Sequence, residues 1–166
     1  MAADCEAVLA INFAAGDAYL ALVRKPRQVC PSDCKILEVP TNLAEWEGLR
    51  EFGQRIVSEA RAHGVAVVAF VDPGTYQGWS YNDARRRATL ETAACLALTC
   101  PGARPVEVRR ISQATIRAAF GCKKDDQFKE ALPAALGLDA KSVVYWKDRR
   151  YAFGAALAIA KELWPQ

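Results

Sequence analysis

The sequence contains a single histidine, His63, and it has neither a glycine-rich phosphate loop nor a G-x-S-x-G motif. His63 precedes Gly64 at the expected end of a helix, where a capping role suits it better than proton transfer. No Ser–His–Asp set is available. These absences argue against a serine hydrolase and against a P-loop nucleotide enzyme.

Long apolar runs are absent as well. No run approaches the roughly 20 residues of a membrane-spanning helix, and Met1–Asp4 lacks the basic and then apolar layout of a signal peptide. We therefore expect a cytoplasmic protein without a membrane partner. The net charge of +3 is mild and permits a nucleic-acid partner without requiring one. At 166 residues, 52% of them hydrophobic, the chain suits one domain over residues 1–166.

The six cysteines are poorly spaced for a metal site. Structural zinc needs paired short spacings, usually with histidine help. Free, mostly buried thiols in a reducing compartment are the simpler interpretation. The cysteines form a C-x-x-x-C pair at Cys30 and Cys34, a pair around a helix end at Cys95 and Cys100, and two isolated positions at Cys5 and Cys122.

The most informative stretch is Val8–Val23, VLAINFAAGDAYLALV. It predicts two apolar strands joined by a tight turn at Ala14–Asp17, the first of them buried on both faces. Asn12 is the one polar side chain near the end of that strand. A buried polar side chain costs stability unless it has a partner or a function, so Asn12 is the first residue to explain.

The remaining pattern predicts an α/β fold. Lys35–Val39 alternates like a third strand, and Val65–Val71 reads as a central, parallel strand that ends in the turn sequence Asp72–Gly74. Crossovers after three antiparallel strands imply a mixed five-stranded sheet with helices on both faces. A capping box at Asn42 and Glu45 is expected to open the first helix, which places one apolar stripe on a single face: Trp46, Leu49, Phe52, Ile56 and Ala60. The other expected helices run over Asn82–Leu98, from a Ser112 cap to Gly121, over Gln127–Leu136, and from about Asp148 to Trp164. A strand is expected over Pro105–Arg110 and an apolar connector at Val143–Trp146.

Three short stretches carry a resemblance to a known family. They are V-L-A-I-N-F at Val8–Phe13, V-V-A-F-V-D at Val67–Asp72 and A-A-L-A-I-A at Ala155–Ala160. With the order of elements, and with the segment Ser112–Leu138 before the last helix, they resemble the ribonuclease H-like superfamily. Within that superfamily they resemble the branch of the RuvC-type Holliday-junction resolvases.

This resemblance implies phosphodiester cleavage by two divalent metals, held by carboxylates from the first strand, the fourth strand and the last helix. The matching positions here are Asn12, then Asp72 or Val71, and Ala155, with Ala152 one turn earlier. An amide and two methyl groups leave too little negative charge for two cations. The acid set is thus degenerate, and no catalytic residue is assigned.

Other acids could in principle rebuild a metal site. The candidates are Asp17, Asp72 and Asp148. Each also has an ordinary structural role: Asp17 as a turn residue, Asp72 as a turn initiator before Pro–Gly, and Asp148 as a helix cap. Likewise Asn12 can serve as a polar anchor for the backbone instead of a ligand.

Basic and aromatic residues suggest nucleic-acid contact. The segment Tyr76–Arg87, YQGWSYNDARRR, interleaves rings that can stack on bases with cations that can pair with phosphates. Alternatively, Trp79 and Tyr81 close the rim of the core while the arginines, about 100° apart on the helix, fan out to solvent. The full candidate set is Tyr76, Trp79, Arg85, Arg86, Arg87, Arg109, Arg110, Lys123, Lys124, Arg149 and Arg150, the last two at a helix start that could also bind an anion.

Three functions follow from these observations. The first is a catalytically inactive RuvC-like module that binds nucleic acid, DNA or RNA, or scaffolds a nucleoprotein complex, with no cofactor expected. The second is an active nuclease with rearranged carboxylates, for which Mg²⁺ or Mn²⁺ would be the cofactor. The third is a protein–protein module, including a homodimer, for which Trp46 and Phe52 could face a partner instead of the core.

Overall fold

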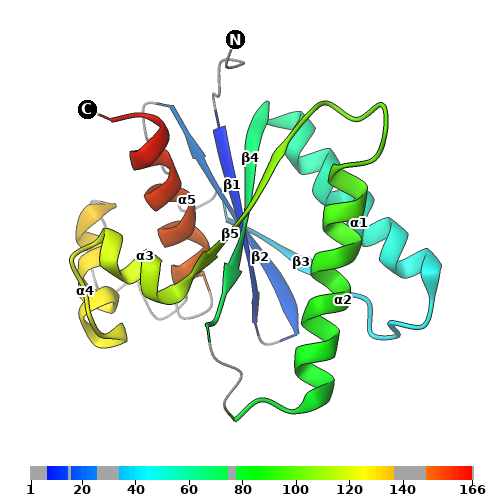
Figure 1. Ribbon diagram of the computed structural model, residues 1–166, viewed down its shortest axis with the longest axis horizontal. Coiled ribbons are helices and arrows are strands. Elements are labelled where there is room, and N and C mark those ends of the chain that lie inside the picture. The colour runs from blue at the N-terminus through cyan, green and yellow to red at the C-terminus, as the bar shows by residue number, and fades with distance from the viewer. Residues whose placement is uncertain (1–6, 15, 26–33, 75–77, 137–148, 166) are drawn as a thin grey trace.

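The computed structural model describes residues 7–14, 16–25, 34–74, 78–136 and 149–165. Tyr76, Val143–Trp146 and Asp148 lie outside the described residues. Five strands form one sheet in the order β3-β2-β1-β4-β5 (Figure 1). The strands are β1 (Ala7–Ala14), β2 (Asp17–Arg24), β3 (Cys34–Glu38), β4 (Val65–Asp72) and β5 (Glu107–Ser112). The pairs β1/β2 and β2/β3 are antiparallel, and β1/β4 and β4/β5 are parallel, which confirms the predicted mixed sheet.

Helices cover both faces of the sheet. The helices are α1 (Trp46–Ala62), α2 (Tyr81–Leu98), α3 (Gln113–Ala119), α4 (Asp125–Ala135) and α5 (Arg150–Leu163). In Figure 1, α1 and α2 lie on one side of the sheet, and α3, α4 and α5 lie on the other. No described helix is both long enough and apolar enough to cross a bilayer.

The alternation of β1 decides which residues face which layer. Leu9, Ile11 and Phe13 belong to the apolar cluster with α1 and α2, whereas Val8 and Ala10 belong to the cluster with α5. Because side chains alternate along a strand, Asn12 points toward the α5 side. The first strand is buried on both faces, as predicted, and Asn12 is only 5% exposed.

The start of α1 differs from the prediction. Its N-cap is Glu45, without a side-chain cap, and the Asn42 side chain accepts from the Ala44 N–H (3.1 Å) and donates to Glu45 Oε1 (2.8 Å). The polar pair therefore forms a turn before the helix instead of a capping box. Trp46, the first helical residue, is 84% exposed, so its predicted place in the core is wrong. The other four members of that stripe are buried: Leu49, Phe52, Ile56 and Ala60.

Several element ends shift by a few residues. The fifth strand lies two residues later than predicted, and α4 begins at Asp125 instead of Gln127. The Ser112 cap is confirmed, since its Oγ accepts from the Thr115 N–H at 3.0 Å. His63 is the C-cap of α1, followed by Gly64 at φ 61°, also as predicted.

A glycine allows the second layer to pack closely. A Cβ atom placed on Gly154 of α5 would lie 2.5 Å from Phe128 Cζ and 2.7 Å from Ile116 Cγ2. Real carbon atoms do not approach so closely, so α5 depends on this glycine to approach α3 and α4.

Candidate functional site

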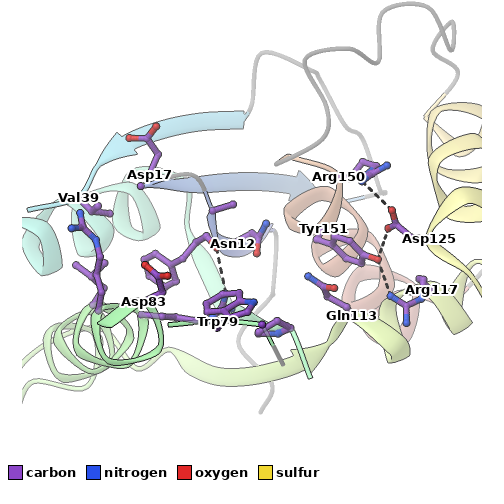
Figure 2. Close-up of a pocket in the computed structure, with 18 residues that line it drawn as sticks. Asn12, Asp17, Val39, Trp79, Asp83, Gln113, Arg117, Asp125, Arg150 and Tyr151 are labelled. Carbon is purple, nitrogen blue, oxygen red and sulfur yellow. Dashed lines mark hydrogen bonds and ion pairs between the residues drawn. The ribbon is translucent and has the colours of Figure 1, made fainter. Parts of the chain in front are cut away.

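A pocket of about 830 Å³ opens where β1 ends and the first turns of several helices meet. We call it the β1 pocket. Its lining includes Asn12 from β1, Asp83 from α2, Gln113 from α3, Asp125 from α4 and Arg150 from α5. Figure 2 shows Asn12 between two walls, with Trp79 and Asp83 on one side and Tyr151, Asp125 and Arg117 on the other. This is the sheet end at which the family resemblance places a two-metal site.

The positions expected to hold acids do not supply them. Asn12 lines the β1 pocket with an amide. Ala152 and Ala155 of α5 are fully buried, in the same apolar cluster as Val8 and Ala10. The amide oxygen could bind a cation weakly, but the two alanines present only methyl groups.

Asp72 does not belong to this site. Val71 belongs to the α5-side cluster and Phe70 to the α1/α2-side cluster, so Asp72 follows Phe70 in the alternation and lies on the side opposite Asn12. Its Oδ1 accepts from the Gly74 N–H at 2.9 Å, which is the turn role that its neighbours Pro73 and Gly74 predicted. On the Asn12 face, the fourth strand therefore ends in a valine.

Three other aspartates do line the pocket, but two of them are already engaged. Asp83 accepts from the Ser80 hydroxyl (2.7 Å), while its own N–H donates to Ser80 Oγ (3.1 Å), which caps α2. Asp125 accepts from Tyr151 and Arg150. Asp17 is half-buried at the start of β2. Within the described ranges, no three His, Cys, Asp or Glu side chains are grouped to hold a metal, so the donor set does not fit two divalent cations.

One wall of the pocket is a chain of charge-assisted hydrogen bonds, which we call the tyrosine network. The Tyr151 hydroxyl donates to Asp125 Oδ1 (2.7 Å) and accepts from Arg117 Nη1 (2.9 Å). Arg150 Nη2 donates to Asp125 Oδ2 (3.3 Å). Burial, and then the hydrogen bond to Asp125, raise the pKa of Tyr151, so the phenol stays neutral and keeps its proton on the bond to the carboxylate.

The two arginines of this wall differ in burial, since Arg150 is buried and Arg117 is half-buried. Arg150 is 5% exposed, and its Nε has no hydrogen-bond acceptor in the part of the chain that the structure describes. Arg117 Nε likewise has no hydrogen-bond acceptor among the described residues. Each guanidinium is therefore held by a hydrogen bond and keeps an Nε–H donor that no described residue takes up.

The other wall comes from α2. Arg87 is 4% exposed; its Nη1 donates to the Phe13 carbonyl (3.3 Å), and its guanidinium carbon lies 5.9 Å from the centre of the Trp79 ring. Arg86 Nη2 donates to the Pro40 carbonyl at 3.1 Å. Arg85 is exposed. The three consecutive arginines diverge as their 100° spacing predicted, but Arg87 turns inward instead of fanning out to solvent.

The aromatic residues of this segment separate in the same way. Trp79 is 38% exposed and lines the pocket, whereas Tyr81 is 78% exposed and does not line it. Tyr81 therefore does not close the rim of the core.

The other predicted nucleic-acid residues lie outside the pocket lining. Arg109 Nε contacts Glu107 Oε1 (2.6 Å), and its Nη1 contacts Glu162 Oε1 (3.0 Å). Arg110 Nε contacts Glu91 Oε1 (2.7 Å). Lys123 and Lys124 are exposed at the start of α4, and Arg149 is half-buried at the start of α5. The structure thus brings together Trp79, Arg86, Arg87 and Arg150 from the predicted set.

Several residues of the pocket were not predicted from the sequence: Asp83, Gln113, Arg117, Asp125 and Tyr151. One signal was available for Tyr151, because it directly precedes Ala152, one of the positions at which the resemblance predicts an acid. No local pattern joins Asp125 to a tyrosine 26 residues later.

The fold is the ribonuclease H-like fold of the RuvC-type resolvases. The chain is similar to RuvC from Thermus thermophilus, with a TM-score of 0.73, 14% identity and 95% of each chain covered. The same RuvC in complex with a Holliday junction substrate gives a TM-score of 0.71 at 15% identity, with 96% of each chain covered.

A third structure, the yeast mitochondrial Holliday junction resolvase Ydc2, gives a TM-score of 0.62 at 9% identity, with 95% of this chain and 78% of that chain covered. No protein-family model matches the sequence, and no curated protein matches it. At these identities the likeness concerns the fold.

Proposed function

We propose that this chain is a RuvC-like module that binds nucleic acid and does not cleave it by two-metal chemistry. The observation that supports this proposal most directly is the lining of the β1 pocket: Asn12 stands where the resemblance calls for an acid, and Arg86, Arg87, Arg117 and Arg150 surround the same space. Two cations close together need several carboxylates around them, whereas arginines favour phosphate.

The fold supports the choice of ligand. One of the similar solved structures is described as T. thermophilus RuvC with a Holliday junction substrate. An aromatic ring beside cations, as at Trp79 and Arg87, suits a nucleotide strand because bases stack and phosphates pair. A cytoplasmic location stays a prediction from the sequence.

The competing proposal of an active nuclease with rearranged acids has less support. It requires Asp17, Asp72 and Asp148 to converge, yet Asp72 lies on the other face of the sheet and accepts from Gly74. Asp148 lies outside the described residues.

A protein-binding function has one observation in its favour. Trp46 is 84% exposed and Leu96 is 66% exposed, and both line a surface groove of α1 and α2. Such large exposed side chains can serve a protein partner, and the groove shares Asp83 and Arg86 with the lining of the β1 pocket.

The test combines binding and cleavage. Fluorescence anisotropy with a four-way DNA junction and with a single strand, across a salt series, measures affinity and its ionic component. We expect salt-dependent binding that weakens in Arg86→Gln/Arg87→Gln and stays unchanged in Arg55→Gln, which removes an exposed charge of α1 that does not line the β1 pocket. We also expect the DNA to stay intact with Mg²⁺ or Mn²⁺. Absence of binding at low salt would favour the protein-binding function. Metal-dependent cutting would favour the competing proposal of an active nuclease.

A further inference from the structure

We infer that the β1 pocket is a metal-independent phosphate site, in which buried guanidinium groups hold a phosphate of a nucleotide strand at the place where a two-metal nuclease would use cations. That the ligand is a nucleic-acid strand rests on the proposed function. That the pocket binds phosphate does not depend on it. The ligand class is a phosphate monoester or diester that carries a base.

The charge of the pocket lining favours an anion. Four arginines face three aspartates, and two of those aspartates are committed. Asp83 caps α2, and Asp125 is shared between the Tyr151 hydroxyl, Arg150 and Lys129, whose Nζ lies 3.6 Å from Oδ2. One carboxylate thus serves two cations and a phenol, which leaves positive charge on the tyrosine-network wall.

The guanidinium groups are fixed before any ligand arrives. Tyr151 holds Arg117, and Asp125 holds Arg150, each through a hydrogen bond that involves a charged group. Arg150 is 95% buried, and its Nε has no acceptor among the described residues. Because the arginines are fixed, little side-chain entropy is lost on binding, and planar donors remain for phosphate oxygens. Tyr151 and Asp125 are therefore positioning residues.

The centre of the pocket is compatible with this ligand. Asn12 offers a neutral amide, which can donate to a phosphate oxygen, whereas a carboxylate there would repel it. Trp79, on the opposite wall in Figure 2, is 38% exposed and offers a ring face for a base. A volume of about 830 Å³ accommodates one nucleotide unit.

The test uses the full chain and three probes in the presence of a chelator. Isothermal titration calorimetry with thymidine 5′-monophosphate and with thymidine asks whether the phosphate is required. Anisotropy with a dT single strand, repeated with Mg²⁺ at matched ionic strength, asks whether a metal is required. We expect the nucleotide to bind and the nucleoside to fail, with strand affinity unchanged by Mg²⁺.

The variants separate contact residues from general charge. Arg117→Gln and Arg150→Gln should each weaken nucleotide binding by about tenfold or more, and the slope of log K against log salt for the strand should fall by about 0.7 per lost contact. Arg55→Gln is the control of equal charge. Tyr151→Phe keeps both arginine charges but removes the hydrogen bond that holds Arg117, so it should weaken nucleotide binding while leaving that slope nearly unchanged.

Circular dichroism checks that each variant folds. If a glutamine variant does not fold, Arg117→Lys is measured in its place. It keeps the charge but loses the planar fork, so we expect weaker nucleotide binding with an unchanged slope.

The outcomes are distinct. Two results would overturn the inference of a phosphate site: loss of strand binding on chelation, and folded arginine variants that bind like Arg55→Gln. Either result would leave the proposed nucleic-acid function standing. Binding of the nucleotide without binding of any strand would support the phosphate site and overturn the proposed function.

Discussion

Removal of one oxygen from Tyr151 tests the tyrosine network directly. The Tyr151→Phe variant keeps the ring, which packs on Phe128 with centroids 5.1 Å apart, and it deletes the hydrogen bonds to Asp125 (2.7 Å) and from Arg117 (2.9 Å). The hydrogen bond from Tyr151 to Asp125 contributes less stability than a fully buried one. The Asp125 side chain is 43% exposed, and in the variant it still pairs with Arg150. About 1 kcal/mol for each bond gives a loss of about 2 kcal/mol.

The measurement is urea unfolding at neutral pH, with Tyr81→Phe as the control. Tyr81 is 78% exposed, so its hydroxyl should contribute almost nothing. For a chain of this size, a loss of about 2 kcal/mol also lowers the melting temperature by roughly 4–8 °C. A loss below about 0.5 kcal/mol would mean that these hydrogen bonds do not hold the wall together, and the argument for fixed arginines would fail.

The same variant has a defined pH dependence. The pKa of Tyr151 is raised in the folded protein, first by burial and then by the hydrogen bond to Asp125. A group of this kind contributes stability that is present below its unfolded pKa of about 10 and is lost as pH rises through the folded value. The difference in unfolding free energy between wild type and Tyr151→Phe should therefore shrink above about pH 10, and a constant difference would contradict the stated burial of the phenol.

Other predictions concern the pocket, the packing and the thiols. Asn12→Asp should weaken thymidine 5′-monophosphate binding by about tenfold in calorimetry, because one negative charge costs about 1.4 kcal/mol or more against a phosphate in a partly buried site; it should not restore Mg²⁺-dependent cleavage on a gel. Gly154→Ala should destabilise the protein by about 1–3 kcal/mol in urea unfolding, despite its better helix propensity, because the new Cβ would meet Phe128 at 2.5 Å. Cys34 should react with maleimide at neutral pH far more slowly than the exposed Cys100, as peptide mapping would show, since burial raises the pKa of the Cys34 thiol to about 11.

The sheet was predictable because its signals are local. A near-continuous apolar run predicts a strand buried on both faces, and Val65–Asp72 does lie parallel beside β1. Asn12 could be identified as the residue of interest for the same reason, since it is the one polar side chain in such a run.

The walls of the pocket were not predictable, because they depend on contacts between distant elements. Arg117 meets Tyr151 across 34 residues, and Arg150 meets Asp125 across 25. Helical periodicity also misled at one end of α1: Trp46 continues the apolar spacing, but as the first residue of the helix it is exposed.

The alanines of α5 and the arginines of the pocket both bear on the charge of the site. A two-metal site needs a negative lining to hold its cations, and a metal-independent phosphate site needs a positive one, so no intermediate lining serves both. Ala152 and Ala155 are fully buried beside Ala10, and a carboxylate at either position would be an unpaired charge in an apolar layer. The substitution Asn12→Asp alone would therefore add a charge that repels phosphate without supplying the further ligands that a metal requires. If the proposed function is correct, two-metal cleavage would need acids at several of these positions together, with the pocket arginines removed.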